Sequence, residues 1–292
     1  MRQRISLVLA AALLAATLPP VLAEEGPGHS FLWKVSDGPR TVHLLGSIHF
    51  MKDEAYPLSP VIEQAYASSS LLVFETDMEG LGEAAFKLMA AGGLDDGRTL
   101  ADAAGPELYR LVSERFDAMG MDTAAFDGMK PWMVALSLTS IELMRAGYLG
   151  SEGIDAHFSE RANADGKPTR GLETPEFQVS LFADLSEQEG REFLAYSLED
   201  LETVIPLVDE IVVAWSAGDV DRIEELLTEG FHEHPELLEK MVTRRNLRWL
   251  PQVEALLGGD VDAMVVVGSL HLVGGQGLVE LLREKGYEVV QQ

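Results

Sequence analysis

Short, uninterrupted hydrophobic runs predict β-strands, and they are concentrated near the two ends of the chain. A polar turn at residues 36–40 joins the first two runs as in a β-hairpin. Runs of about five Val, Leu or Phe residues are typical of strands covered on both faces, as in α/β folds. The predicted strands are 31–35 (FLWKV), 41–45 (TVHLL), 71–75 (LLVFE), 263–267 (AMVVV), 287–290 (YEVV) and, more weakly, 168–172 (PTRGL).

Helical patterns fill the rest of the chain, mostly between the two groups of strands. The sequence therefore predicts an α/β fold. It consists of a mixed, mostly parallel sheet formed by both ends of the chain, with a helical subdomain inserted at roughly residues 81–260. Residues 24–292 are expected to form a single domain. The predicted helices are 59–67, 106–118, 131–146, 155–164, one starting after Thr174-Pro175, 187–217, 219–228, 235–257 and 276–285.

Residues 1–23 have the features of a cleavable secretory signal peptide. Two arginines precede an apolar run over residues 5–18, and Val21 and Ala23 stand at the −3 and −1 positions of a signal peptidase site. The alternative is an uncleaved membrane anchor, but the run is shorter than the ~20 residues that span a bilayer. We expect cleavage after Ala23, a periplasmic or secreted location, and no stable membrane insertion after cleavage.

The charge balance and the absence of cysteine exclude several classes of function. The chain has 48 acidic and 22 basic residues, which gives a formal net charge of −26. Because such a surface repels phosphate backbones and anionic lipids, we expect no nucleic-acid partner and no polybasic docking to a membrane. A peptide or small-molecule substrate is implied by the function hypotheses given below. Without cysteine there are no disulfides, thiolate metal ligands or thiol nucleophiles.

One motif occurs twice. Residues 42–49 (VHLLGSIH) and 264–271 (MVVVGSLH) are both a predicted buried strand followed by Gly-Ser-aliphatic-His. His49 and His271, which are 222 residues apart, therefore follow two strands at the same spacing. Ligands of open α/β sheets bind outside the carboxyl ends of the strands. A single Gly-x-x-His is more often structural, but two copies predict a shared site.

Acidic residues end two other predicted strands. Glu75 ends the run 71–75, and an apolar strand rarely ends in an acid that has no partner. Beside two histidines, Glu75 could be a metal ligand, a general base or an acceptor that orients an imidazole. A helix cap or a solvated loop acid is the structural alternative. Glu173 stands in the same position after the run 168–172, and its alternative is stabilisation of the following helix.

Three further polar residues are candidates for substrate binding or for support of the histidines. Asp155 either caps the following helix or faces the site. Arg245 and Asn246 follow Arg244 on the predicted helix 235–257 and stand out in an acidic chain. They form either an exposed basic face or a clamp for a substrate carboxylate or for the two glutamates.

Together these residues resemble the TraB/GumN family, whose animal relatives include the Tiki proteases. The resemblance implies an α/β core that carries two Gly-x-x-His motifs and an acidic residue. The metal-dependent peptidase site of the Tiki branch falls on His49, Glu75 and His271 of this sequence. The matching segments run in family order: FLWKV, HLLGSIH, the strand ending in Glu75, KPWMVAL (130–136), GIDAHF (153–158), GLET (171–174), RRNLRW (244–249) and VVGSLHLVGGQGLVELLREKGYEV (266–289).

Three hypotheses for the function follow. The first is a secreted hydrolase, a metallopeptidase in which His49, His271 and Glu75 bind Zn²⁺, Mn²⁺ or Co²⁺ and Glu173 transfers a proton. The second is a metal-independent, esterase-like hydrolase, as in the similar erythromycin esterases. The third is a non-catalytic ligand-binding protein. If the side chains share a metal, their ligand atoms should lie within ~4 Å of one another.

Overall fold

The computed structural model describes residues 28–38, 40–77, 81–95, 97–231 and 235–292. The signal peptide expected at residues 1–23 lies outside these residues. Across the described segments, no helix combines the length and the apolar character needed to cross a bilayer.

Six strands form one sheet in the order β4-β3-β5-β2-β1-β6. β4, β3, β5 and β2 are parallel neighbours, whereas β1 is antiparallel to both β2 and β6. The predicted mixed, mostly parallel sheet is therefore confirmed, and β5 from the end of the chain lies between two strands from its beginning. The strands are β1 (Leu32–Asp37), β2 (Arg40–Ser47), β3 (Leu71–Thr76), β4 (Thr169–Glu173), β5 (Ala263–Gly268) and β6 (Glu288–Gln291).

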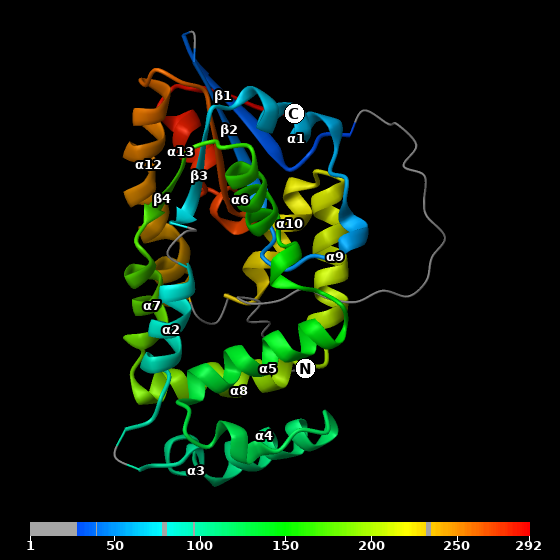
Figure 1. The fold of residues 1–292 in the computed structure, drawn as a ribbon, viewed down its shortest axis with the longest axis vertical. Helices are drawn as coiled ribbons and strands as arrows, with labels where there is room; N and C mark the ends of the chain where they lie inside the picture. The colour runs from blue at the N-terminus through cyan, green and yellow to red at the C-terminus, as the bar shows by residue number, and fades with distance from the viewer. Residues whose placement is uncertain (1–27, 39, 78–80, 96, 232–234) are drawn as a thin grey trace.

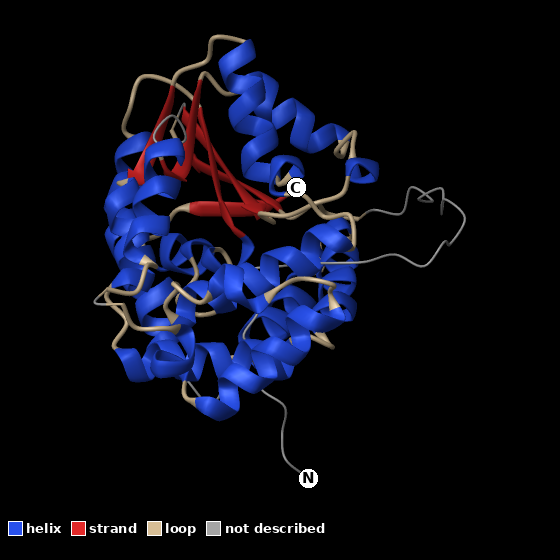
Figure 2. Cartoon of the chain, turned by 60° about the horizontal axis from the view of Figure 1, so that its bottom comes forward, coloured by secondary structure: helices blue, strands red, loops and turns tan. Residues whose placement is uncertain are grey.

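Helices cover both faces of the sheet and also form a second, helical half (Figures 1 and 2). The main core joins the sheet to α1 (Pro60–Ser68), α6 (Ile154–Ala164), α9 (Val204–Ser216), α10 (Val220–Glu229), α12 (Arg244–Leu257) and α13 (Leu278–Glu284). A second core, which includes Phe116, Leu138 and Leu194, joins α3 (Leu100–Ala104), α4 (Pro106–Ala118), α5 (Pro131–Arg145) and α8 (Glu187–Asp200). The expected insertion therefore contributes to both halves, because β4 and several of its helices pack in the sheet core.

The structure differs from the sequence prediction in three helical regions. The single helix expected at 187–217 is two helices, α8 and α9. The chain breaks between them because Leu201 packs in the second core, whereas Val208 packs in the main core. The expected helix 235–257 contains a π-helical segment, Glu239–Thr243, between α11 (Pro235–Leu238) and α12. Two helices were not expected, α2 (Leu81–Ala91) and α3; α7 (Pro175–Ala183) begins where the Thr174-Pro175 signal places it.

The two copies of the Gly-Ser-aliphatic-His motif lie on adjacent parallel strands. β2 and β5 pair with Ser47 opposite Gly268, so the copies are offset by one residue. The hydroxyl of Ser269 donates a hydrogen bond to the carbonyl oxygen of Ser47 at 3.0 Å. This bond ties the two strand ends together where the histidines follow.

Candidate functional site

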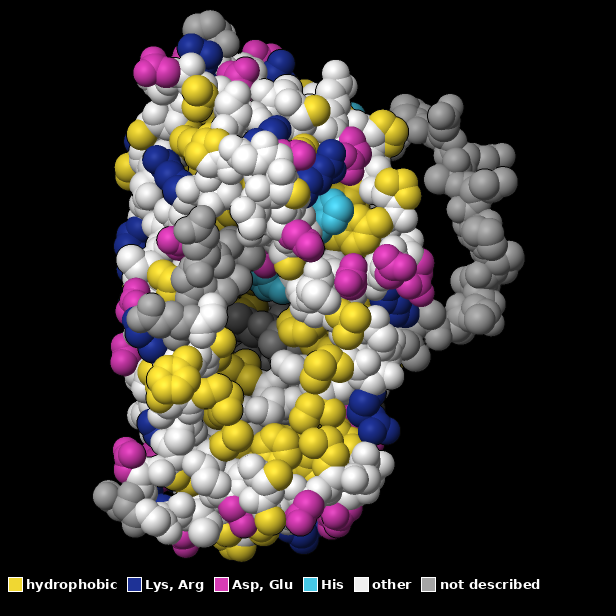
Figure 3. Space-filling view, in the orientation of Figure 1, with side chains coloured by type: hydrophobic (Ala, Val, Ile, Leu, Met, Phe, Trp, Pro, Cys, Tyr) yellow, Lys and Arg dark blue, Asp and Glu magenta, His cyan; other side chains and the backbone are white. Residues whose placement is uncertain are grey.

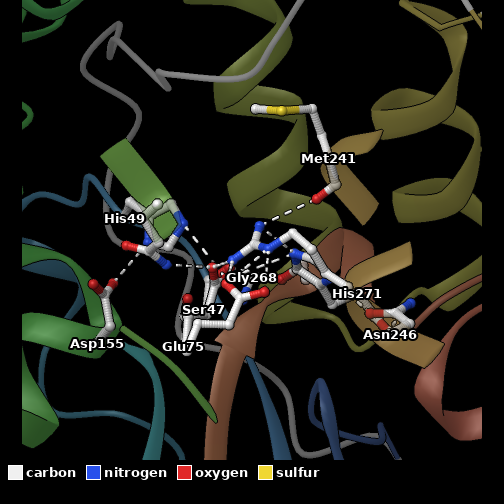
Figure 4. Close-up of polar contacts among 12 residues, drawn as sticks. Ser47, His49, Glu75, Asp155, Met241, Asn246, Gly268 and His271 are labelled. Atoms are coloured by element: carbon white, nitrogen blue, oxygen red, sulfur yellow. Dashed lines mark hydrogen bonds and ion pairs between the residues drawn. The ribbon is translucent and has the colours of Figure 1, made fainter. Parts of the chain in front are cut away.

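Four neighbouring parallel strands bring four of the candidate side chains to one edge of the sheet, and Figure 4 shows three of them, His49, Glu75 and His271. His49 follows β2, Glu75 lies in β3, and His271 follows β5. Glu173 is the last residue of β4. A β-carbon added at Gly268 would lie 3.1 Å from Oε1 of Glu75 and 3.6 Å from Nε2 of His49, so glycine leaves the room in which these groups meet.

The imidazole of His49 is held by a carboxylate from α6. Its Nδ1 lies 3.1 Å from Oδ1 of Asp155, and its Nε2 faces Oε1 of Glu75 at 4.0 Å. Burial opposes protonation, but Asp155 and then Glu75 outweigh it and raise the pKa of His49 to about 9. The side chain is 52% exposed, so solvent weakens both effects. His49 is therefore the accessible histidine of the pair.

The imidazole of His271 is buried and held by an amide. The Asn246 side-chain nitrogen donates to the carbonyl oxygens of His271 and Gln276, at 3.1 and 2.8 Å, so its oxygen faces Nδ1 of His271 at 2.7 Å. That arrangement puts the proton on Nδ1 and leaves Nε2 as an acceptor. Burial, helped by the charge of Arg245, lowers the pKa of His271 to about 3. The ring also packs on Trp249.

Glu75 lies between the two histidines. Its Oε1 is 4.0 Å from Nε2 of His49 and 3.9 Å from Nε2 of His271, so the two nitrogens can be no farther apart than the sum of these distances. The backbone N–H of Gly268 donates to the same oxygen at 2.8 Å. Burial raises the pKa of Glu75, but Arg245 and both histidines hold it well below its usual range.

Arg245 joins the two glutamates. It donates to Oε2 of Glu75 at 2.5 Å and, through Nε and Nη2, to Glu173 at 2.8–3.2 Å. Another N–H donates to the carbonyl oxygen of Met241 at 3.1 Å. Met241 is in the π-helical segment, and such segments are frequent at functional sites. Of the alternatives considered from the sequence, the structure therefore contains the one in which Arg245 clamps the two glutamates.

Glu173 is buried behind Arg245. Its side chain is 6% exposed, and its ion-pair partners are Arg245 and, at 3.7 Å, Arg248. Burial raises the pKa of Glu173, and Arg245 opposes this shift. Glu173 therefore anchors Arg245 in the structure. The proton-transfer role expected from the sequence stays a prediction.

The donor set matches a divalent transition metal in type and orientation. Both Nδ1 atoms contact an oxygen, so both Nε2 atoms turn towards Glu75, as in metal sites where a second group orients each histidine. One contact opposes this arrangement, because Nη1 of Arg245 lies 3.1 Å from Nε2 of His271 and takes up its lone pair. Among the described residues, no three His, Cys, Asp or Glu side chains form a ready-made metal site.

Two polar residues of the site were not identified from the sequence. Gln178 of α7 donates to Oε2 of Glu75 at 3.3 Å, and nothing in the sequence separates it from any other helical glutamine. Ser47 is buried, and its hydroxyl has no hydrogen-bond partner among the described residues. The repeated Gly-Ser pair is the signal that would have indicated Ser47.

One face of the molecule is hollowed near its centre (Figure 3). In Figure 3, histidine and acidic side chains border the hollow on one side, and hydrophobic side chains collect on the other. Several large hydrophobic residues are exposed on the helices: Phe86 and Met89 of α2, Met144 of α5 and Val213 of α9. The surface around the hollow is therefore apolar as well as charged.

Comparisons with known proteins agree with the resemblance found in the sequence. The TraB/PrgY/gumN family is matched over residues 31–291. An uncharacterised protein of Escherichia coli (strain K12), YbaP, is 25% identical over 260 residues, which cover 88% of this chain and 94% of that protein. YbaP of Shigella flexneri matches with the same identity and coverage. No solved structure is matched. With a family match over nearly all of its described length, this chain belongs to the TraB/PrgY/gumN family.

Proposed function

We propose that this protein is a hydrolase that cleaves peptide or related acyl bonds, with a divalent metal held by His49, His271 and Glu75. The observation that carries the proposal is the shared orientation of the two imidazoles. Each Nδ1 is fixed by an oxygen, from Asp155 or from Asn246, and each Nε2 lies about 4 Å from one carboxylate oxygen. A histidine with a purely structural role does not require its Nε2 to face a carboxylate, and here two histidines face the same one.

The formal charges of the site favour a bound cation. Glu75, Glu173 and Asp155 bring three carboxylates to the cluster. Among the described residues, Arg245 is the one buried guanidinium, and it pairs with Glu75 and Glu173, whereas Asp155 pairs with His49. With both imidazoles neutral, as metal binding requires, these four groups sum to two negative charges. In the metal-free protein the proton of His49, whose pKa is raised to about 9, offsets one of them. Buried charge that is not compensated is costly, and a divalent ion would balance it. Arg248 contributes less, because it is half exposed and lies 3.7 Å from Glu173.

The chain's own residues have defined tasks in this mechanism. A bound ion would supply a Lewis acid that polarises the scissile carbonyl. Asp155 and Asn246 orient the imidazoles, and the N–H of Gly268 orients Glu75. Arg245, anchored by Glu173, holds a fixed positive charge next to Glu75, where negative charge on the substrate oxygen would be stabilised.

The contact between Arg245 and His271 supports a second candidate, a hydrolase that uses no metal. In that case the guanidinium, rather than an ion, polarises the substrate carbonyl, and His49 with Asp155 transfers the proton. Metal binding instead requires Arg245 to give up its contact with Nε2 of His271 while it keeps Glu173. The two candidates therefore differ in what occupies the space beside His271.

The deciding experiment is metal analysis of the purified protein, followed by assays on peptide and ester libraries before and after dialysis against EDTA. The metal-dependent proposal expects bound Zn²⁺, Mn²⁺ or Co²⁺ and activity that is lost with the ion and restored by it. His49→Ala/His271→Ala should abolish both, whereas the control His29→Ala, at an exposed histidine that is not one of the proposed ligands, should not. Full activity after EDTA supports the metal-independent candidate. A tightly retained ligand with no turnover would replace both by a binding function.

We also propose that the protein is exported and acts in the periplasm or outside the cell. The support is the sequence of residues 1–23. Expression of the full chain in a Gram-negative host, fractionation and N-terminal sequencing test this directly. The expected product starts at Glu24, and a cytoplasmic product that retains Met1 would contradict export.

A further inference from the structure

A second concave surface lies outside the cluster of His49, Glu75 and His271, between α7 and the helix formed by the π-helical segment and α12. Its volume is about 410 Å³, which lies within the 300–1,000 Å³ typical of small-molecule sites. Phe177 and Leu181 of α7 and Leu247 of α12 give it an apolar lining. Leu181 is buried, whereas Leu247 is 52% exposed, so the pocket is open at one side.

Positive charge is concentrated in this pocket although the chain as a whole is strongly acidic. Lys240, Arg244 and Arg248 line it, and their spacing of four residues puts them on one side of the helix. Asp184 is the one acidic residue of the lining. The chain has 22 basic residues among 292 and a net charge of −26, so three cations against one carboxylate is a local reversal of charge.

The three cations are only partly neutralised by their neighbours. Arg244 pairs with Glu239 at 2.9 Å, but both side chains are more than half exposed. Arg248 lies over the ring of Phe177 and reaches Glu173 at 3.7 Å. Among the described residues, Lys240 forms no ion pair, and its charge acts on Glu189 from a distance. The pocket therefore combines an aromatic and aliphatic lining with cations that retain the capacity to bind an anion.

We propose that this pocket binds a small amphipathic anion: a carboxylate, phosphate or sulfonate carried by a short apolar chain or ring. The apolar part would pack on Phe177, Leu181 and Leu247, and the anionic group would be held by Lys240 and Arg244. We assign a dissolved ligand rather than a lipid headgroup, because the net charge of −26 repels an anionic bilayer. α7 also presents Gln178 to Glu75, so a ligand seated on this helix would lie next to the candidate catalytic cluster.

The test uses 8-anilinonaphthalene-1-sulfonate, an aromatic anion whose fluorescence rises in an apolar site, and its uncharged analogue N-phenyl-1-naphthylamine. The full chain should bind the sulfonate at least tenfold more tightly than the analogue, and octanoate should displace it. Lys240→Gln/Arg244→Gln should weaken sulfonate binding at least tenfold. Leu247→Asp, at a half-exposed position where folding is tolerant, should do the same by placing a carboxylate in the pocket.

The matched control is Arg283→Gln/Lys285→Gln, which removes two exposed cations at the end of α13. It should bind the sulfonate as the unmodified chain does. Equal binding of the two dyes, or unchanged binding in both pocket variants, would overturn the proposal. Co-sedimentation with phosphatidylglycerol vesicles without displacement by octanoate would overturn it in favour of a membrane surface. None of these readouts depends on hydrolase activity.

Discussion

Asn246 holds His271 by both ends of its amide. The side-chain oxygen faces Nδ1 of the imidazole at 2.7 Å, and the side-chain nitrogen donates to the backbone carbonyl of the same histidine at 3.1 Å. Asn246 is fully buried, and the histidine is nearly so. The ring is therefore fixed in position and in tautomer, with Nε2 turned towards Glu75.

Asn246→Ala should release this ring and weaken the site more than it weakens the fold. We expect metal affinity or activity to fall about 10–100-fold, as is found when the group that orients a metal-binding histidine is removed. Isothermal titration with Zn²⁺ and a peptide-cleavage assay measure the two effects. Asn163→Ala, at an exposed asparagine of α6, is the control. Equal behaviour of the two variants would show that Asn246 has no orienting role.

Arg245→Lys should lose the geometry of the clamp while it keeps the charge. The guanidinium contacts Glu75 and Glu173 through separate N–H groups, which one ammonium cannot reproduce. Breaking a buried pair costs about 3–5 kcal/mol when a charge is left uncompensated, and because lysine retains the charge we expect about 2–3 kcal/mol. Urea unfolding measures this loss. Arg244→Lys, at the exposed neighbouring position, should change stability by less than about 0.5 kcal/mol.

The two histidines should give opposite pH limbs to the stability of the metal-free protein. The pKa of His49 is raised to about 9, so its contribution is complete below its ordinary value of 6.5 and is lost as pH rises towards 9. The pKa of His271 is lowered to about 3, so its contribution is complete above 6.5 and is lost as pH falls towards 3. Stability should therefore be greatest near pH 6.5.

Chemical denaturation at pH 4, 6.5 and 9, in the presence of EDTA, tests these limbs. His49→Gln should flatten the alkaline limb and leave the acid limb in place, whereas the control His29→Gln should change neither. The alkaline effect should be the smaller of the two, because half of the His49 side chain faces solvent. An alkaline limb that survives in His49→Gln would contradict its assignment to this residue.

The two serines of the repeated motif should respond differently to replacement by alanine. Ser269→Ala removes the hydrogen bond to the carbonyl of Ser47 and should cost about 1 kcal/mol. Ser47→Ala removes a buried hydroxyl that has no partner among the described residues, so stability should be unchanged within about 0.5 kcal/mol or slightly raised. Thermal unfolding of the two variants side by side measures the contrast. A large loss in Ser47→Ala would mean that its hydroxyl has a partner.

The repeated motif made the meeting of His49 and His271 predictable. Each histidine follows a continuous hydrophobic run at the same spacing, and such runs can be recognised in the sequence alone. Parallel neighbours present their carboxyl ends at one edge, so the sequence also predicted that Glu75 and Glu173 lie there. The mixed sheet formed by both ends of the chain followed from the same runs.

The helical half was less predictable, because its boundaries depend on which core each residue joins. The pattern over 187–217 is helical throughout, and the break between α8 and α9 exists because Leu201 packs in one core and Val208 in the other. The π-helical segment before Arg244 has no local signal either. These features are set by contacts between residues far apart in the chain.

The sequence by itself determined which residue types reach the edge of the sheet, because strand pattern and motif spacing are local properties. Only the tertiary structure decided what each of them contacts there. Asp155 lies in the first turn of α6 and contacts His49 instead of capping that helix. Asn246 and Arg245 come from α12, and each of these side chains could equally have faced solvent. The placement of Arg245 between Glu75 and Glu173 results from packing α12 against the sheet. Burial lowers the pKa of His271, whereas the carboxylates of Asp155 and Glu75 overcome burial and raise the pKa of His49.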